Sequence, residues 1–295
     1  MTARIAALAL VLILAGCGAG GQGLDDAGPK DSGPGDGGAP GDGGAPGDGG
    51  CALAANTAAS GTVTNGCALL TRDTSACRAA REAQGLSGFW LEFSCRVTVD
   101  KLDGGLVRLK ADGQPDYPSN YFPTASACYA PYTQMNPNRI VVQSFDFRIP
   151  ETTPDAPQTT GLGPIGLAVN GVALFDDRAA PGDDIFLEAK TFDRCNAHPA
   201  PDGTYHYHAE PYAISVDDGR FIGVLRDGSP VYGRRDADGG VPTLDMAGGH
   251  VGPTADSATP RYHFHVHLEV STSSRSMGQQ QYFLTAGQYH GPPGP

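Results

Sequence analysis

The stretch IGLAVNGVALF, residues 165–175, consists of two short apolar runs on either side of Asn170-Gly171. Asn-Gly between apolar runs favours a tight turn between antiparallel strands, because such turns need residues that tolerate a positive φ. The stretch FIGVLRDGSPVYG, residues 221–233, repeats this design with Asp227-Gly228 at the bend. Both stretches therefore predict β-hairpins, and they decide the fold class.

Short strands punctuated by Gly, Pro and Asp are also predicted before these hairpins. They span residues 89–100, 105–112 and 139–150. The clearest helix signal covers residues 74–86, where Thr74 or Ser75 can cap the start and Gly85 can end the helix. Closely spaced short strands are typical of sandwiches and barrels. We therefore expect a mostly β fold. Residues 95–291 should form a single sandwich- or barrel-like domain that has long loops.

Two histidine-rich stretches hold five of the eight histidines: GTYHYHAEP, residues 203–211, and PRYHFHVHLEV, residues 260–270. We call them the first and the second histidine ribbon. Side chains alternate between the two faces of a strand, so the imidazoles of a ribbon share one face and its aromatic side chains share the other. Aromatic side chains favour the core, which leaves the imidazoles facing solvent or a cleft.

A single histidine precedes each ribbon, His198 in CNAHPAPDG and His250 in MAGGHVGPT, which suggests a duplicated unit. If the two ribbons are neighbouring strands, four or five imidazoles converge on one patch that a single metal ion could bridge. Neutral imidazole is a ligand that suits copper and zinc. The candidate metal ligands are His198, His206, His208, His250, His263, His265 and His267.

Several side chains of the ribbons are candidates for a further ligand or for hydrogen bonds that orient the imidazoles. They are Glu210, Glu269, Tyr205, Tyr207 and Tyr262. A purely structural cluster is the alternative, because crowded neutral imidazoles cost little at neutral pH. The stretch RRDADGG, residues 234–240, resembles half of a calcium-binding loop but lacks the distal Glu, and we expect it to form a solvated turn.

Six cysteines besides Cys17 indicate up to three disulfides in an oxidising compartment. They are Cys51, Cys67, Cys77, Cys95, Cys128 and Cys195. Their spacing favours local bridges among the first four, which leaves a bridge between Cys128 and Cys195, although the sequence alone allows other pairings. Residues 51–94 are therefore expected to form a small disulfide-stapled lead-in to the β domain.

The first 17 residues predict export. Arg4 precedes an apolar run, residues 5–14, that is too short to span a bilayer and is typical of a signal peptide. The run ends in LAGC, which resembles a bacterial lipobox with Cys17 as the lipidated residue; an ordinary secretory leader is the alternative. Because residue 18 is Gly rather than Asp, we expect an outer-membrane or cell-surface protein whose membrane contact is this N-terminal lipid, on either leaflet.

Residues 18–50 are rich in Gly, Pro and Asp, and they repeat the unit PGDGGA. Such a segment cannot bury enough apolar surface to fold, so we predict a disordered tether between the lipid and the folded part. The whole chain carries a formal net charge of −12. This acidity disfavours nucleic acid as a partner, and the sequence indicates no particular protein or glycan partner.

At Tyr205-His206-Tyr207-His208 the chain resembles the YHYH family of exported bacterial proteins. The resemblance covers roughly residues 95–290 and includes both predicted hairpins and both ribbons. Phe264 stands where the second tetrapeptide would have Tyr, and Ala197 replaces the usual Gly before His198. The resemblance implies an exported protein with the architecture of that family, but it implies no reaction.

The leading hypothesis is an exported, lipid-anchored protein that binds copper or zinc through its duplicated ribbons. A metal-dependent or two-histidine hydrolase, or a cupin-like enzyme, is one alternative. The stretch HFHVHLE, residues 263–269, partly fits the cupin pattern H-x-H-x3-E but lacks the glycine that precedes that pattern. A surface module that binds its partner without metal is the other alternative.

Overall fold

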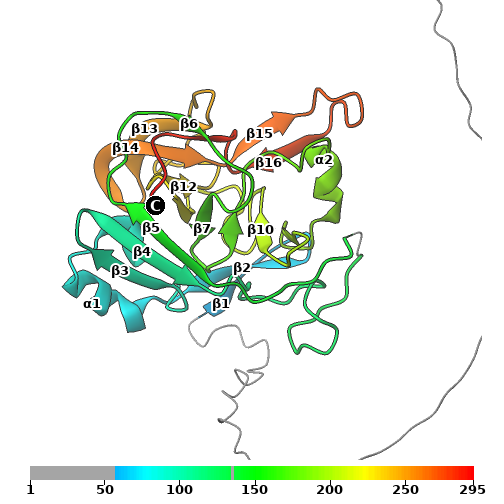
Figure 1. Cartoon of the computed structure of the whole chain (residues 1–295), viewed down its shortest axis with the longest axis horizontal. Helices are drawn as coiled ribbons and strands as arrows, with labels where there is room; N and C mark the ends of the chain where they lie inside the picture. Colours follow the sequence, from blue (N-terminus) through cyan, green and yellow to red (C-terminus); the bar gives the residue numbers. More distant parts are fainter. Residues whose placement is uncertain (1–56, 134–135) are drawn as a thin grey trace, which may run out of the picture. The chain divides into compact units, whose positions relative to one another are not determined.

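The computed structural model describes residues 57–133 and 136–295 (Figure 1). These residues lie in one compact unit, Pro46–Pro295. The regular structure is mostly β, as the sequence predicts. The predicted signal peptide and tether, with Cys17, and also Cys51, lie outside the described residues. Within the described residues, no helix combines the length and the apolar character needed to span a membrane.

The helical segments are short and few. They are α1 (Ser75–Ala83), η1 (Gly88–Leu91), α2 (Ile185–Glu188) and η2 (Ala189–Thr191). The strands are β1 (Thr57–Thr64), β2 (Cys67–Arg72), β3 (Thr98–Leu102), β4 (Leu106–Ala111), β5 (Phe145–Pro150), β6 (Gln158–Thr159), β7 (Gly166–Ala168), β8 (Ala173–Leu174), β9 (His198–Pro199), β10 (Tyr205–Tyr207), β11 (Phe221–Leu225), β12 (Pro230–Tyr232), β13 (Gly249–Thr254), β14 (Ser257–His265), β15 (His267–Val270), β16 (Gln280–Phe283) and β17 (Gln288–Tyr289).

Eight strands form one sheet in the order β13-β14-β12-β11-β7-β8-β10-β9. The order is symmetric about the β7·β11 pair. From the centre outwards, each half consists of a hairpin, a strand that runs parallel to the second hairpin strand, and an edge strand that runs antiparallel to that third strand. We call the half built from β7 to β10 unit 1 and the half built from β11 to β14 unit 2. The sheet therefore contains the same four-stranded arrangement twice, in agreement with the duplication that the histidine spacing suggests.

Both predicted hairpins are confirmed at the centre of this sheet. β7 pairs with β8 around Asn170-Gly171, and β11 pairs with β12 around Asp227-Gly228. Each turn glycine has a φ of 88°, a conformation that a side chain would strain. Gly166 and Gly223 meet the facing strand so closely that a Cβ would lie 2.4 and 2.3 Å from a carbonyl oxygen, respectively.

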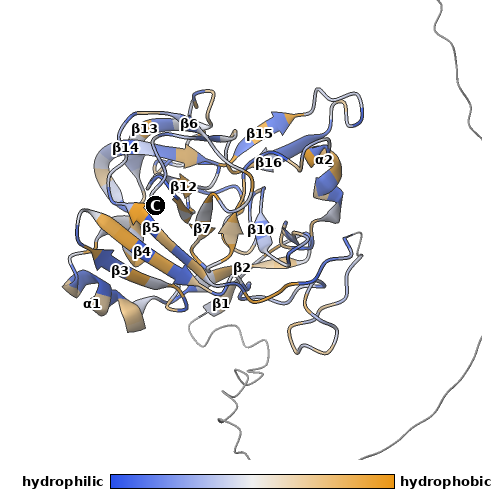
Figure 2. Ribbon diagram, viewed as in Figure 1, coloured by the Kyte–Doolittle hydropathy of each residue, from blue (hydrophilic) through white to orange (hydrophobic). Residues whose placement is uncertain are grey.

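A second, three-stranded antiparallel sheet, β3-β4-β5, packs against the centre of the large sheet. Val107 and Leu109 of β4 share a buried cluster with Leu167 of β7 and Val224 of β11, and hydrophobic residues are conspicuous along β4 in Figure 2. The opposite face of the large sheet is covered by another apolar cluster, to which Ala168 contributes. The result is a sandwich-like arrangement with a core on both sides of the large sheet.

The predicted strand over residues 89–100 is wrong for most of its length. Gly88–Leu91 forms the 3-10 turn η1, and the strand begins only at Thr98. The guanidinium of Arg81 is buried here and donates hydrogen bonds to the carbonyl oxygens of Phe93 and Val97, among others. Because a side chain satisfies these backbone groups, the segment is stable without a strand partner.

The N-terminal lead-in is joined to the β domain by a disulfide between Cys67 and Cys195, and a second disulfide links Cys77 and Cys95. The predicted Cys128–Cys195 pairing is therefore wrong, while the local Cys77–Cys95 bridge agrees with the prediction. Cys128 is also disulfide-bonded. The pairing differs because β2 packs into the same core as the loop before β9: Cys67 and Cys195 belong to one buried cluster.

Candidate metal centres

The two histidine ribbons lie in different halves of the large sheet. The first ribbon forms β10 and the second forms β14, and β12, β11, β7 and β8 lie between them. With strands about 4.8 Å apart, the ribbons are separated by on the order of 24 Å. The predicted convergence of both ribbons on one metal ion is therefore wrong, because each ribbon lies outside its own hairpin.

Each ribbon instead pairs with the single histidine that precedes it. His198 on β9 is in register with His206, and His250 on β13 is in register with His263. Two groups of mutually close ligand atoms result. The first centre contains His198, His206 and His208, and the second centre contains Asp236, His250, His263 and His265.

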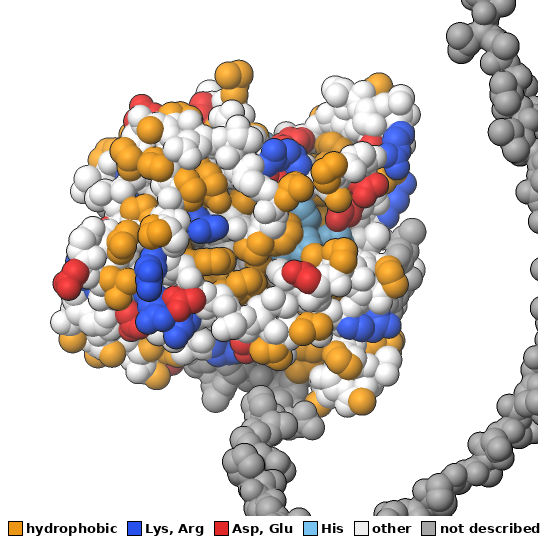
Figure 3. Space-filling view, in the orientation of Figure 1, with side chains coloured by type: hydrophobic (Ala, Val, Ile, Leu, Met, Phe, Trp, Pro, Cys, Tyr) orange, Lys and Arg blue, Asp and Glu red, His pale blue; other side chains and the backbone are white. Residues whose placement is uncertain are grey.

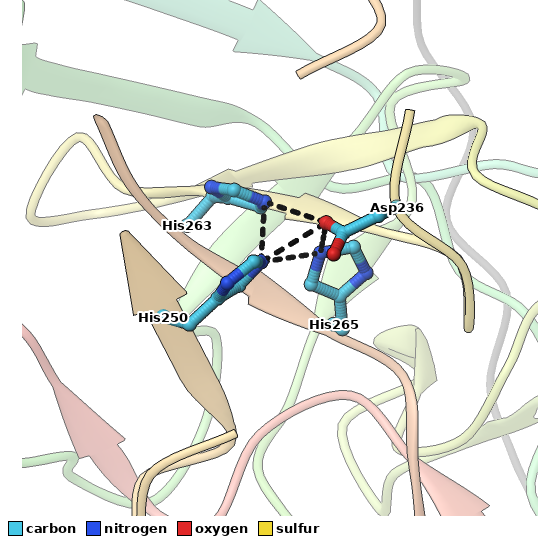
Figure 4. A group of neighbouring side chains, drawn as sticks. All are labelled: Asp236, His250, His263 and His265. Carbon is cyan, nitrogen blue, oxygen red and sulfur yellow. Dashed lines mark hydrogen bonds and ion pairs between the residues drawn. The ribbon is translucent and has the colours of Figure 1, made fainter. Parts of the chain in front are cut away.

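In the second centre, four ligand atoms lie close together and their side chains point toward one another (Figure 4). Nε2 of His250 lies 3.1 Å from Nε2 of His263 and 3.3 Å from Nε2 of His265. Asp236 Oδ1 lies between 3.1 and 3.8 Å from all three nitrogens. A tetrahedral ion with bonds of about 2.0 Å separates its ligand atoms by about 3.3 Å. The spacing of these atoms thus fits a bound metal ion.

In the first centre, Nε2 of His206 lies 3.0 Å from Nε2 of His208. With a ligand atom of His198, these atoms lie within 4.8 Å of one another. All three side chains are buried, each with 2% exposure. Phe175 stacks on His206 with 3.8 Å between ring centroids, and Phe192 packs edge-on against His198. Aromatic walls therefore hold the rings in place.

Backbone carbonyl groups fix the orientation of the four ribbon imidazoles that belong to the two centres. Nδ1 of His206 and of His263 each bonds the carbonyl oxygen two residues earlier. Nδ1 of His208 and of His265 each bonds a carbonyl oxygen in the segment that follows β8 or β12. A carbonyl oxygen only accepts, so in the neutral ring the proton is on Nδ1 and Nε2 is left unprotonated.

His198 is held in place by side-chain contacts at both of its ring nitrogens. Its Nδ1 lies 2.6 Å from the hydroxyl oxygen of Thr191, and that hydroxyl donates its own proton to the backbone carbonyl of Glu188. Nε2 of His198 lies 3.2 Å from a carboxylate oxygen of Glu188. In the first centre, the Nε2 atoms of His206 and His208 are therefore the facing acceptors, whose lone pairs repel one another unless a cation lies between them.

Burial keeps the four ribbon imidazoles of the two centres neutral. It lowers the pKa of His208 to about 4, with repulsion from His198 as the next cause, and it lowers the pKa of His265 to about 4 as well. The pKa of His206 falls well below its usual value, and that of His263 is also lowered, chiefly by burial. Neutral imidazole is the form that binds metals, so a metal ion suits these centres better than a proton at neutral pH.

The two centres differ in the position of their carboxylate. Asp236 approaches all three nitrogens of the second centre. Glu188, the last residue of α2, lies 3.2 Å from Nε2 of His198. Among the described residues, however, the group of mutually close ligand atoms in the first centre consists of three histidines alone.

A cavity of about 300 Å³ borders the first centre. The three histidines and Glu188 line it together with apolar residues that include Leu162, Phe175 and Pro199. Figure 3 shows histidine side chains at the base of a hollow near β10 and α2. The first centre is therefore accessible to small molecules although its rings are buried.

His267 and the two predicted glutamates lie outside both groups. β14 ends at His265, and His267 begins β15, which pairs with β16 in another sheet. Nε2 of His267 lies 3.1 Å from Glu269, so the cupin-like spacing does not bring Glu269 to the second centre. Glu210 is fully buried and forms an ion pair with Arg234.

Two of the predicted tyrosines hold the loops that carry the single histidines. The hydroxyl of Tyr205 donates to Asp193, and that of Tyr262 donates to Asp245. Each aspartate also accepts two backbone N–H groups from the loop that leads to β9 or β13. These contacts are equivalent in the two units. They place the single histidine opposite its ribbon without touching an imidazole.

Tyr207, the third tyrosine, belongs to a buried polar network on the core side of β10. Its hydroxyl forms a hydrogen bond of 2.6 Å with the hydroxyl of Tyr117 and accepts one of 3.1 Å from the side-chain amide of Asn170. Asn170 also donates to Asp116, which forms an ion pair with Arg72 of β2. Tyr207 therefore links the first ribbon to the lead-in, and not to the metal ligands.

Comparison with protein families matches the part of the chain that holds the first centre. Residues 146–243 match the model of a family described as YHYH protein. The chain contains a YHYH domain. The match includes all of the first centre, whereas the three histidines of the second centre lie beyond the matched residues. No curated protein and no solved structure matches the chain.

Sequence reasoning missed the carboxylates that lie beside the first and the second histidine ribbon. Glu188 was not singled out, and Asp236 lies within the stretch that we expected to be a solvated turn. In both units a carboxylate precedes the single histidine, which in turn precedes the H-x-H pair. With 32 acidic residues in the chain, that order alone could not identify these two.

Proposed function

We propose that this is an exported metal-binding protein that holds two zinc or copper ions, one at each histidine centre. The observation that carries the proposal is the convergence of three imidazoles in each centre, whose Nε2 atoms are 3.0 to 3.3 Å apart where they are closest. In the first centre the facing Nε2 atoms of His206 and His208 are both acceptors, so their lone pairs need a cation between them. The lowered pKa values of these two rings and of His265 disfavour a proton.

The donor sets support zinc and copper over calcium or magnesium. Three imidazoles dominate each centre, and hard cations such as calcium and magnesium prefer oxygen ligands. Three nitrogens and one carboxylate oxygen at tetrahedral spacing, as in the second centre, form a donor set typical of zinc. Copper binds the same imidazoles, so direct competition between the two metals should decide which one is retained.

Elemental analysis of the full chain, folded with zinc or copper and then freed of loosely bound ions, tests the proposal. We expect two ions per chain, one for each centre. His206→Ala and His263→Ala should each retain one ion, and the double variant should retain none. His290→Ala is the matched control: His290 stacks on Tyr262 outside both centres, so this variant should keep both ions. Absence of metal from the unmutated chain would contradict the proposal.

Export and lipid anchoring complete the proposed function. A YHYH domain is consistent with an exported protein, and the disulfides require an oxidising compartment. We propose that Cys17 carries a lipid that holds the protein at the outer membrane or cell surface. Labelling with a radioactive fatty acid should mark the wild-type chain and not Cys17→Ser, which should move to the soluble fraction; equal labelling of both would contradict the anchor.

A further inference from the structure

The two centres differ in what can reach them. From this difference we infer that the first centre is an open metal site: three histidines hold the metal ion, and its remaining position faces the adjoining cavity and takes a small donor molecule from solution. The second centre is closed by its own aspartate. The inference rests on the proposed function, because it assumes that both centres hold a metal ion.

The second centre has a complete set of ligand atoms. The three histidine nitrogens and Asp236 Oδ1 supply four donor atoms. Asp236 Oδ1 lies within 3.8 Å of each nitrogen, and Nε2 of His250 lies within 3.3 Å of the other two nitrogens. Four protein ligands in a tetrahedron leave no position for an exogenous ligand, which is the usual state of a structural metal site.

The first centre lacks such a fourth ligand. Glu188 approaches Nε2 of His198, but it is not part of the group of mutually close ligand atoms. Three protein ligands with one position left open are typical of metal sites that bind and transform small molecules. The cavity of about 300 Å³ adjoins all three histidines, so the open position has room for such a molecule.

The walls of the cavity indicate the class of ligand. Leu162, Phe175, Pro199 and Pro201 give it apolar surface beside the imidazoles. Its one arginine, Arg178, has its guanidinium already bonded to the carboxylate of Asp176. Asp183 and Glu188 also line the cavity, so the walls offer little free positive charge to the ligand. The metal itself would then be the main attraction. The structure thus fits a small molecule that donates one lone pair to the metal and lays an apolar group along these walls.

Cobalt(II) as a spectroscopic substitute for zinc allows the two centres to be compared in the full chain. In His263→Ala, which retains the first centre, we expect azide to change the visible absorption of bound cobalt. In His206→Ala, which retains the second centre, azide should leave the spectrum unchanged. Benzoate should bind the first centre at least tenfold more tightly than acetate, because only benzoate has an apolar body for the cavity wall.

A cavity-filling substitution tests whether the exogenous ligand enters through this space. Ala180 lines the cavity and is exposed, so Ala180→Trp in the His263→Ala background should keep its cobalt and bind benzoate at least tenfold more weakly. Ala79→Trp, on the exposed side of α1, is the matched control and should bind benzoate normally. An Ala180→Trp variant with unchanged benzoate affinity would overturn the inference.

The outcomes separate this inference from the proposed function. If neither single-centre variant retains cobalt, the proposed function fails. If both retain cobalt but azide changes neither spectrum, or changes that of the second centre as well, metal binding stands and the distinction between an open and a closed centre is wrong. A response confined to the first centre supports the inference.

Discussion

At the scale of single residues, Asp236 and Glu188 carry the same charge but contact their histidines differently. Asp236 approaches all three nitrogens of its centre, whereas Glu188 approaches His198 only. A carboxylate in contact with every nitrogen is placed to be a metal ligand, whereas one in contact with a single ring lies at the edge of its group. Their substitution should therefore have unequal effects.

Asp236→Asn should lower the metal affinity of the second centre by roughly 100-fold, because a neutral amide replaces a charged ligand, while Glu188→Gln should lower that of the first centre by roughly tenfold or less. Each substitution is introduced into the variant that retains only the affected centre, and affinity is measured by competition with a chelator. Equal losses in the two centres would mean that the two carboxylates have the same role.

At the scale of elements, the contact between β7 and β11 joins the two units of the large sheet. Leu167 and Val224 are paired at its midpoint, and Gly166 and Gly223 occupy equivalent positions beside them. Neither position has room for a side chain, because a Cβ would run into the backbone of the facing strand. The approach of the two units thus depends on these glycines.

Gly166→Ala should destabilise the protein by about 1 to 3 kcal/mol, since the added methyl group would lie 2.4 Å from the carbonyl oxygen of Val224 and force the strands apart. Gly161→Ala is the matched control, because nothing lies within 4 Å of its Cβ position. Denaturation by urea gives both free energies of unfolding. A loss no larger for Gly166→Ala than for the control would show that the strands can separate at little cost.

The elements that the sequence predicts are those with local causes. Asn170-Gly171 and Asp227-Gly228 force tight turns by their own conformational preferences, and both hairpins are confirmed. The segment before β3 is not a strand because Arg81, distant in sequence, satisfies its carbonyl groups. Such a contact leaves no pattern in the segment itself.

The histidines of both centres could be predicted from residue type and alternation, but their partners could not. The order of strands in a sheet depends on long-range pairing, and here it places two hairpins between the ribbons. That order replaces one expected site with two. The carboxylates Glu188 and Asp236 lie outside the ribbons, so the period of a strand gives no information about them.

At the scale of the whole molecule, the lead-in is joined to the β domain by a buried ion pair as well as by a disulfide. Nε of Arg72 lies 2.6 Å from Asp116 Oδ2. Burial alone would raise the pKa of Asp116, but attraction to Arg72 and hydrogen bonds from Arg72 and Asn170 outweigh burial and lower it. A carboxyl group with a lowered pKa in the folded state stabilises the fold at higher pH, and this stabilisation is lost as the pH falls through the folded pKa.

Asp116→Asn should therefore lower the free energy of unfolding at neutral pH by about 3 kcal/mol, because it leaves Arg72 buried without its counter-charge. The difference between wild type and variant should begin to shrink below about pH 4, where Asp116 becomes protonated in the unfolded chain, and should vanish as the pH falls through the lowered pKa of the folded state. Urea denaturation between acidic and neutral pH measures this difference. Asp103→Asn, at an exposed position, is the control with an expected difference near zero. A difference for Asp116→Asn that did not change with pH would contradict the ionic role.

The Cys67–Cys195 disulfide also bears on how firmly the first centre is held. Cys195 lies in the loop that Asp193 holds just before His198, so this bond ties one wall of the first centre to β2. A chain with free thiols lacks that covalent tie, although the contacts of Asp193 still hold the loop. If the first centre binds a metal ion as proposed, oxidation of these two thiols should therefore tighten its hold on the ion.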